Sequence, residues 1–423
     1  MRLIAFVCAA IATLRIGVLV TRAQLLLTVE SMGDFGRFYY ALRSWWAGGS
    51  LYAPTVATPD QVLDGRWMPL LDLAPPHLHL LIAPFAVAPP PVAFWLWLAI
   101  NVASLVYAII LVVRELDLRL SPEAWVLTLT GLLFVRPWNG AWLGQYAFLL
   151  AVPATLAWKA ARRNDWIVAF AWLGIILSFK PFVILFALHA ALHRRWTAIA
   201  VLLGTAALCA VPGVLVFGLR SYWEWTSALS TSNSWMWLYE NMSAGGILAR
   251  TLGSNPVFAP FPNASLHVIA WLALLAAVIV AATLWRTLSV NLDEAWVLLW
   301  MAGLLASPLG WSYYVWWAMG PIVAVAHRRR WVARTAVGPF LLGLALVLPL
   351  EVTLVGQPSP WATLTFGSLS GWCGVALWLL VALPCRSVSA VQPAAPPQRV
   401  HDAQHDDHHQ HAKGKRTHEP SFT

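Results

Sequence analysis

Apolar stretches recur along almost the whole 423-residue chain and leave few ways to fold it. With 60% hydrophobic and only 11% charged residues, the composition excludes an ordinary soluble domain. Lipid offers no water to satisfy backbone groups, so runs of this kind must form helices. The sequence therefore predicts an all-α, polytopic integral membrane protein with about 12 transmembrane helices. The predicted crossings are residues 3–20, 91–113, 124–135, 147–158, 166–179, 181–192, 196–217, 266–285, 295–306, 313–326, 337–350 and 361–383.

Basic residues gather in short loops between these runs and indicate how the chain is oriented. Arginines and lysines cluster at 114–119, 159–163, 194–195 and 328–330, and the positive-inside rule places such loops in the cytoplasm. This distribution accounts for the formal net charge of +9, so we expect no nucleic-acid partner. We therefore expect a multi-pass protein of the bacterial inner (cytoplasmic) membrane, surrounded by membrane lipids, whose working face is periplasmic or exterior.

The same orientation divides the chain into one membrane domain and a tail. Residues 1–385 form the predicted transmembrane domain, with external loops at 31–77 and 220–265. Residues 386–423 are rich in proline, glutamine and histidine, which predicts a disordered cytoplasmic tail with at most incidental metal affinity. The four cysteines are widely spaced and match no disulfide or zinc pattern, so redox chemistry is not expected.

The first external loop carries an acid where the chain has just crossed the membrane. Asp34 opens a segment that also contains Arg37 and Tyr39, and apolar residues recur at helical spacing from Phe35 to Trp46. This pattern predicts an amphipathic helix that lies on the membrane with its aromatic face in the interface. From local sequence alone, Asp34 is either a functional carboxylate or a helix N-cap.

Other unusual polar residues fall in the same set of external segments. Lys180 lies between two apolar runs, where its ammonium suits a phosphate or snorkels to the membrane surface. Asn241, Ser243 and Arg250 are spaced to share a helical face, and an arginine binds phosphate bidentately. The amide of Gln145 suits hydrogen bonding to sugar hydroxyls or capping of a helical hairpin.

Aromatic residues complete this external set. Trp311, Tyr313 and Tyr314 open a predicted helix, as sugar-contacting groups or as interface anchors. One carboxylate, several cations, amides and aromatics are thus predicted on a single membrane face. Transfer of a sugar from a lipid phosphate needs such a set, because the acceptor hydroxyl needs a base and the leaving phosphate needs positive charge.

In order along the chain, these segments resemble glycosyltransferase family 87, which has the GT-C fold. The matching pieces are DFGRFYYALRSWWAGGSLY from Asp34, APP before His77, GQ at Gly144, KP at Lys180, NMS at Asn241 with Arg250 following, and SPLGW at Ser307. The resemblance runs from Gly33 to about Ala326. It implies an α-helical bundle whose cavity opens to the outer leaflet. This chain has Tyr313 and Tyr314 where many relatives have histidines.

The resemblance implies an inverting hexosyltransferase that uses a polyprenyl-phosphate sugar, usually mannose, and a lipid or glycan acceptor. Asp34 matches the family's general base. Lys180, Arg250 and Arg37 are then expected to stabilise the donor phosphate. Sugar or acceptor contacts are expected from Tyr39, Gln145, Asn241, Ser243, Trp311, Tyr313 and Tyr314.

Such donors carry no nucleotide pyrophosphate, so we predict no metal and no cofactor. Two other functions fit a polytopic protein with intramembrane charges. One is a lipid or solute transporter or flippase, although the chain lacks the matched repeats typical of transporters. The other is a ligase that moves a whole lipid-linked glycan or another group onto an acceptor.

Overall fold

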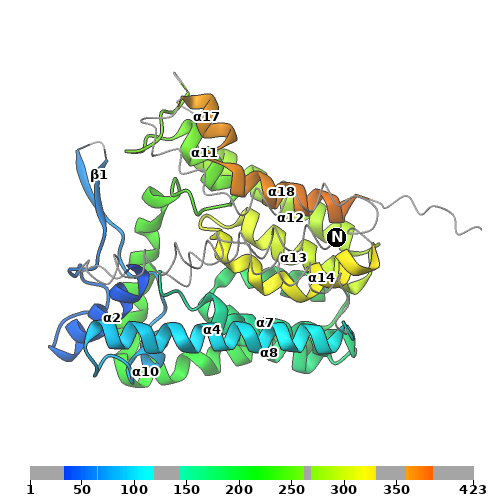
Figure 1. The fold of residues 1–423 in the computed structure, drawn as a ribbon, viewed down its shortest axis with the longest axis horizontal. Helices are drawn as coiled ribbons and strands as arrows, with labels where there is room; N and C mark the ends of the chain where they lie inside the picture. The colour runs from blue at the N-terminus through cyan, green and yellow to red at the C-terminus, as the bar shows by residue number, and fades with distance from the viewer. Residues whose placement is uncertain (1–32, 64, 119–142, 262–267, 330–358, 384–423) are drawn as a thin grey trace, which may run out of the picture. The chain divides into compact units, whose positions relative to one another are not determined.

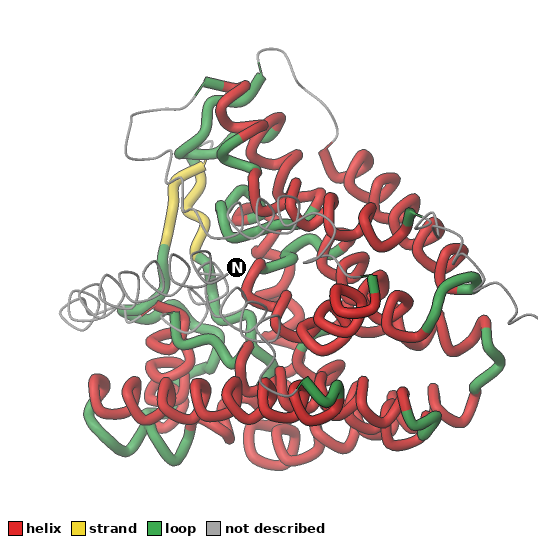
Figure 2. The backbone as a smooth tube through the Cα atoms, turned by 45° about the vertical axis from the view of Figure 1, so that its right-hand side comes forward, coloured by secondary structure: helices red, strands yellow, loops and turns green. Residues whose placement is uncertain are grey.

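The computed structural model describes residues 33–63, 65–118, 143–261, 268–329 and 359–383. Within these ranges the chain is mostly helical, with one two-stranded sheet (Figures 1 and 2). All of them lie in the first of the two units into which the chain divides, Met1–Leu383 and Pro384–Thr423. The predicted crossings at 3–20, 124–135 and 337–350 and the histidine-rich tail lie outside the described residues.

The longer helices follow the apolar runs closely, and shorter elements lie between them or at their ends. The first half of the chain contains α2 (Gly33–Trp46), β1 (Asp60–Leu63), β2 (Arg66–Pro69), α3 (Leu78–Ile82), α4 (Pro90–Glu115), α7 (Ala147–Arg162), α8 (Trp166–Phe179), η1 (Pro181–Ile184) and α9 (Leu185–Leu192). The second half contains α10 (Trp196–Thr231), η2 (Ser232–Trp235), α11 (Ala244–Leu252), α12 (Val268–Thr287), α13 (Leu292–Ala306), η3 (Ser312–Ala318), α14 (Met319–Arg328), α17 (Pro360–Thr365) and α18 (Leu369–Ala382).

Three helical segments among the described residues are long and apolar enough to cross a membrane: Pro90–Glu115, Trp196–Trp235 and Ala270–Thr287. The 26 residues of α4 make about 39 Å of helix at 1.5 Å per residue. This helix begins at prolines, whose missing N–H groups are unneeded in a first turn. Several other predicted crossings form shorter apolar helices. The chain is thus a helical membrane protein, and the total of about 12 crossings stays a prediction.

The long helix α10 bends where the chain leaves its predicted apolar run. Gly218 has φ 77° and ψ 164°, a conformation that interrupts the helix and that glycine adopts readily. The part before the bend matches the predicted crossing at 196–217. The part after it shows that the start of the external loop predicted at 220–265 is helical as far as Thr231.

The core of the described unit is built from helices that bury apolar side chains on every side. α13 is buried continuously from Ala295 to Leu305, as expected for a helix without a polar face. Trp296 and Trp300 pack their ring edges against Phe186 of α9, with ring centroids 5.0 and 4.8 Å apart. α4, α7 and α8 lie side by side, and α10 packs against α8 (Figure 1).

Opposite ends of these helices carry different chemistry. At one end, Glu115 closes α4 and pairs with Arg162 and Arg163 of α7, while Asp293 at the start of α13 pairs with Arg162 and Arg328. The other ends of α4, α7, α8 and α13 meet the segments described below as the candidate site. The helices therefore separate the basic clusters from the segments of the candidate site, and the orientation in the membrane stays a prediction.

The predicted amphipathic helix of the first external loop is α2, but the prediction for its aromatic face was wrong. Phe35, Phe38 and Leu42 are buried in the protein rather than in the membrane interface. Phe35 meets Phe94 of α4 edge to face, with ring centroids 5.7 Å apart. The reason is that α3 and α4 offer an apolar surface that α2 covers. Among the aromatic residues of α2, only Trp46 at its end is substantially exposed.

Candidate active site

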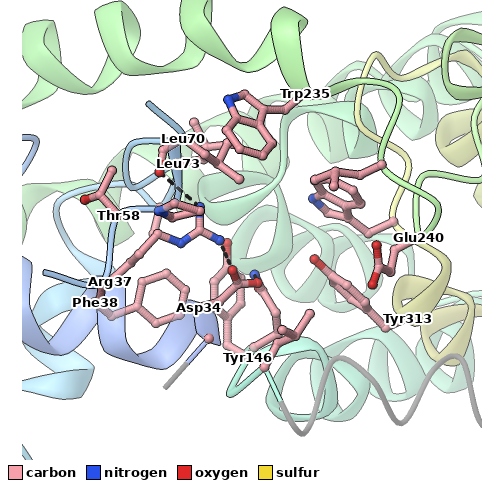
Figure 3. Close-up of a pocket in the computed structure, with 18 of the residues that line it drawn as sticks. Asp34, Arg37, Phe38, Thr58, Leu70, Leu73, Tyr146, Trp235, Glu240 and Tyr313 are labelled. Carbon is pink, nitrogen blue, oxygen red and sulfur yellow. Dashed lines mark hydrogen bonds and ion pairs between the residues drawn. The ribbon is translucent and has the colours of Figure 1, made fainter. Parts of the chain in front are cut away.

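A cavity of about 360 Å³ lies at the end of the bundle opposite the basic clusters (Figure 3). Its wall comes from residues 33–38, 56–59, 70–74, 143–146, 235–240 and 311–313 together with Lys180. These segments are far apart in the chain, and most belong to the predicted external loops. The size suits a ligand as large as a hexose with its attached groups.

Asp34 lies in the first turn of α2 and points into this cavity (Figure 3). Its two carboxylate oxygens are held by different groups, because Arg37 forms an ion pair with one and the side-chain amide of Gln145 donates to the other. The side chains of Asp34 and Arg37 are only 11% and 10% exposed. The carboxylate is therefore oriented by two partners, one of which carries a positive charge.

The loop that brings Gln145 to Asp34 depends on a glycine. Gly144 has φ +71°, and a Cβ on it would lie 2.3 Å from the Cβ of Phe35. The backbone N–H of Phe35 donates to the Leu143 carbonyl at 2.8 Å, and the Trp97 indole donates to the Gly144 carbonyl at 2.7 Å. The GQ motif thus combines a close backbone approach at Gly144 with a functional amide at Gln145.

Lys180 enters the cavity from the end of α8, and the following proline explains why the helix stops there. A residue before proline disfavours the helical region, and Lys180 is extended with φ −139° and ψ 105°. Its ammonium lies 5.3 Å from the ring centroid of Tyr146 and 5.1 Å from that of Tyr314, which are cation–π distances. Among the described side chains, it forms no ion pair with a carboxylate.

Burial and the nearby charges set the titration of this lysine. Burial lowers the pKa of Lys180 to about 7, with the Arg37 charge acting in the same direction and the Asp72 charge opposing both. An anion next to Lys180 would favour its protonated form. The ammonium is therefore available to a ligand phosphate. The phosphate would supply a negative charge in contact with Lys180, which no described carboxylate does.

A second cavity of about 490 Å³ adjoins Lys180 and is mainly apolar. Its lining includes Phe182, Leu185 and Leu188, with Leu229 and Val280 from other helices. Lys180, Trp311 and Leu73 line both cavities. The first cavity, which also holds Asp34, Arg37 and Glu240, and the apolar second cavity therefore meet at Lys180.

Arg250 does not line either cavity, contrary to the expectation that it binds the donor phosphate. It is fully buried, and its guanidinium donates to the carbonyls of Leu238 at 2.7 Å and Asn241 at 3.1 Å and to the Ser368 hydroxyl at 3.2 Å. These carbonyls belong to the loop that precedes α11, so the loop folds around the Arg250 guanidinium. Arg250 holds the wall of the site in place from behind.

Asn241 and Ser243 also lie behind the wall, with Arg250, and do not line the cavity. The structure therefore does not place them where the expected sugar contacts would require. The Asn241 side-chain amide donates to the Pro308 carbonyl at 2.9 Å, and its oxygen accepts from the backbone N–H of Gly310 at 2.9 Å. Ser243 caps α11 by accepting from Gly246 at 3.0 Å. The NMS motif thus joins its own loop to the SPLGW segment.

The aromatic candidates divide between the cavity and the layer behind it. Two of them line the cavity: Trp311, which precedes the short helix η3, and Tyr313, which lies on it. Tyr314 is buried beside Lys180 and does not line the cavity. Tyr39 is also absent from the lining, since its hydroxyl donates to a backbone carbonyl just before α4 at 2.9 Å.

Arg37 is in the cavity, but its described contacts are with protein groups. Besides the ion pair with Asp34, it donates weakly to the carbonyls of Leu70 and Leu71 at 3.5 and 3.4 Å (Figure 3). Asp34 and Lys180 share one cavity, whereas Arg37 is engaged by the carboxylate and Arg250 lies behind the wall. Of the three cations expected to bind the donor phosphate, Lys180 and Arg37 line the cavity and Arg250 does not, and a phosphate role for Lys180 or Arg37 stays a prediction.

Two buried acids near the site were missed from the sequence. Glu240 lines the cavity and is 8% exposed. Asp72 accepts from the backbone of Ala74 at 2.8 Å and pairs with His79 at 2.9 Å, and its charge acts on both Arg37 and Lys180. Neither acid belongs to a periodic pattern, and the only available signal was a carboxylate in an otherwise apolar external segment.

The described residues contain no group of three or more histidines, cysteines or acids placed to hold a metal ion. The absence of a metal or cofactor from the reaction stays a prediction. What the site does contain is an oriented carboxylate, an amide, an ammonium and aromatic rings around one cavity. This set suits proton transfer from a hydroxyl and binding of an anionic leaving group.

Comparisons with known proteins agree with this chemistry. Residues 73–308, more than half of the 423, match the model of glycosyltransferase family 87. A polyprenol-phosphate-mannose-dependent alpha-(1-2)-phosphatidylinositol mannoside mannosyltransferase from Mycolicibacterium smegmatis is 28% identical over 392 residues, which cover 84% of this chain and 85% of that relative. No solved structure matches the chain. The helical membrane architecture, the cavity and the family match together identify the chain as a member of glycosyltransferase family 87.

Proposed function

We propose that this protein transfers a hexose, mannose in the first instance, from a polyprenyl-phosphate donor to a lipid-linked or glycan acceptor. The observation that carries this proposal is that a cavity with charged side chains and a more apolar cavity meet at Lys180. A polyprenyl-phosphate sugar has a sugar on one side of its phosphate and an apolar chain on the other. The donor in the printed name of the mycobacterial relative supports mannose on polyprenol phosphate.

Asp34 acts as the general base in the proposed reaction. Its carboxylate takes the proton of an acceptor hydroxyl while the hydroxyl oxygen attacks the anomeric carbon. The bond between the anomeric carbon and the phosphate oxygen breaks, and its electron pair leaves with the polyprenyl phosphate. Attack opposite to the leaving group inverts the configuration. Gln145 and Arg37 hold the carboxylate in position throughout.

Lys180 stabilises the phosphate as negative charge develops on it. Electrostatic stabilisation by a fixed cation is strong in a site shielded from water. The apolar cavity on the other side of Lys180 accommodates the first isoprene units of the donor. Arg250 contributes indirectly, because it fixes the loop that carries the opposite wall.

We place the reaction at the outer face of the membrane. The pairs that join Glu115, Asp293 and the arginines near them lie at the helix ends far from the cavity. The positive-inside rule assigns those basic ends to the cytoplasm. The cavity then faces the periplasm, where the acceptor lipid is reached from the outer leaflet.

The test is transfer by purified protein in lipid nanodiscs, supplied with a panel of polyprenyl-phosphate sugars and acceptor glycolipids and analysed by mass spectrometry. We expect one new glycolipid, one hexose heavier than the acceptor, only when a polyprenyl-phosphate hexose is present. Movement of the donor across the bilayer of a proteoliposome without any glycolipid product would instead establish a transporter and overturn the proposal.

The base assignment is tested with Asp34→Asn, which keeps the shape but removes the proton acceptor. Loss of a general base typically costs about 100- to 10,000-fold, so we expect kcat to fall by at least about 100-fold. Asp165→Asn is the matched control, because Asp165 caps α8 at 3.1 Å and asparagine caps as well. Wild-type turnover by Asp34→Asn would show that another group takes the proton.

A further inference from the structure

The acid missed from the sequence, Glu240, lies on a wall that the backbone holds firmly beside the aromatic segment. The Glu240 carbonyl accepts from the Ser312 N–H at 2.9 Å, and the Met242 N–H donates to the Gly310 carbonyl at 2.8 Å. Asn241 and Trp311 form an antiparallel bridge between these bonds. Glu240 is therefore fixed relative to Trp311 and Tyr313, although 70 residues of chain separate Asn241 from Trp311.

The three side chains form one polar and aromatic wall. Trp311 and Tyr313 have ring centroids 6.2 Å apart and nearly parallel planes at 19°. Glu240 and Tyr313 both line the cavity and lie on the same side of it (Figure 3). A pyranose ring offers C–H faces to aromatic rings and hydroxyl donors to a carboxylate, so this wall suits a sugar.

The position of this wall also indicates which sugar it would meet. Trp311 and Lys180 line both cavities, so Trp311 stands beside the proposed phosphate position. The hexose of the donor is bonded directly to that phosphate and must lie next to it. Glu240 and Tyr313 continue the wall from Trp311 into the cavity that holds Asp34, where the hexose would extend.

Resting on the proposed function, we propose that Glu240 binds hydroxyl groups of the donor hexose through its carboxylate and thereby selects the sugar. The two cavity carboxylates then have separate duties. Asp34, which Arg37 and Gln145 hold, faces the acceptor hydroxyl, whereas Glu240 reads the donor. A site that hydrogen-bonds a substrate hydroxyl rejects an analogue that lacks this hydroxyl, because the bond to the carboxylate is then lost.

The experiment combines the enzyme variant with altered donors. Donors are prepared as polyprenyl-phosphate mannose and as analogues that each lack one hydroxyl remote from the anomeric carbon. For wild-type protein, kcat/KM should fall about 10- to 100-fold for the analogue that lacks the contacted hydroxyl, as expected for a hydrogen bond to a charged group. For Glu240→Ala, mannose and that analogue should differ less than about threefold, because no carboxylate remains to distinguish them.

Two further variants separate recognition from folding. Glu240→Gln keeps the size of the side chain and should show intermediate discrimination, mainly through KM for the donor. Glu224→Gln is the matched control. Glu224 lines neither cavity, pairs with the exposed Arg220 and accepts a hydrogen bond from the Ser50 hydroxyl, which the glutamine oxygen also accepts, so this variant should discriminate as wild type does.

The outcomes are distinct. If both Glu240 variants lose the same factor of kcat/KM on every donor and still discriminate between mannose and the analogue as wild type does, Glu240 does not recognise the donor. The proposed transfer stands in that case. Unchanged discrimination overturns donor recognition by Glu240 as well. Failure of wild-type protein to use any polyprenyl-phosphate sugar overturns the proposed function itself, and the assignment of Glu240 falls with it.

Discussion

Lys180 illustrates how a single side chain is made ready for an anion. Its ammonium packs against two tyrosine rings and, among the described residues, has no carboxylate partner in contact. Burial lowers its pKa to about 7, so a substantial fraction of the free protein loses this proton near neutral pH. A donor phosphate binds best when the lysine is protonated, which couples donor use to pH.

We expect kcat/KM for the donor to fall as pH rises through about 7. Below that value Lys180 is mostly protonated in the free protein. Above it the protonated fraction decreases, by up to about tenfold for each further pH unit. Lys180→Arg should abolish this decline, because a guanidinium stays charged across the range. A pH–rate profile of initial velocities checks the expectation.

Lys159→Arg provides the control for that profile. Lys159 lies at the other end of α7, 3.7 Å from Glu115, so its substitution should leave the decline unchanged. If the decline persists in Lys180→Arg, another group titrates near pH 7. The pH dependence would then no longer support binding of a phosphate by Lys180.

Residue identities near the site were predictable to an uneven degree. Asp34 and Lys180 stand out because ionisable groups beside apolar runs are costly and hence conspicuous. Arg250 stands out for the same reason, but the structure uses its charge to bind carbonyls inside the protein. Glu240 was overlooked as a site residue because nothing in its neighbours reveals that its loop pairs with residues 310–312.

At the scale of elements, the contact between α2 and the loop before α7 determines where Asp34 meets its partners. Gly144 allows this contact, since any side chain there would overlap Phe35. Gly48 offers a useful comparison. It has a similarly positive φ of +88°, but nothing lies within 4 Å of a Cβ added to it.

Gly144→Ala should therefore be much more damaging than Gly48→Ala. Both substitutions cost about 1 kcal/mol or more of backbone strain, but only the first also forces α2 and the loop apart. We expect Gly144→Ala to reduce kcat at least about tenfold and to lower the melting temperature, while Gly48→Ala keeps wild-type activity. Turnover assays and thermal unfolding by intrinsic fluorescence measure both. Equal effects of the two substitutions would mean that strain, rather than the contact with Phe35, is responsible.

The sequence predicted α2 as an amphipathic helix but placed its apolar face in the membrane interface. Helical periodicity identifies which residues share a face, and it does not identify what that face touches. The answer depends on α3 and α4, which lie beyond the helix in the chain and close against it. Likewise, the short runs at 166–179 and 181–192 were recognised as helical, and the turn between them follows from the Lys-Pro pair.

At the scale of the whole molecule, the charged ends opposite the cavity join several helices. Asp293 is 3% exposed, accepts from the Trp158 indole at 2.9 Å and pairs with Arg162 at 3.4 Å and with Arg328. It therefore links α7, α13 and α14. Its partners are partly exposed, so the link is weaker than a fully buried ion pair.

Asp293→Asn should lower stability without changing the chemistry. We expect a loss of about 2 kcal/mol, below the 3–5 kcal/mol typical of a broken fully buried pair, because solvent screens Arg162 and Arg328. The melting temperature should fall by several degrees while kcat/KM of the folded protein stays within about twofold. Glu224→Gln should leave the melting temperature nearly unchanged, because its partner Arg220 is exposed and the glutamine oxygen still accepts from the Ser50 hydroxyl. Loss of kcat/KM in folded Asp293→Asn would instead link this end of the bundle to the site.

The sequence by itself determined that the chain is a helical membrane protein, where most of its helices lie and which family it resembles. Those conclusions rest on local properties, namely hydropathy, periodicity and the order of short motifs. Only the tertiary structure decided which polar residues share a cavity. It joined Asp34, Gln145, Lys180 and Glu240 from distant segments and withdrew Arg250 and Asn241 into the supporting wall. The reason is physical, because a buried polar side chain serves a ligand or the protein according to the backbone groups that surround it, and only folding brings those groups together.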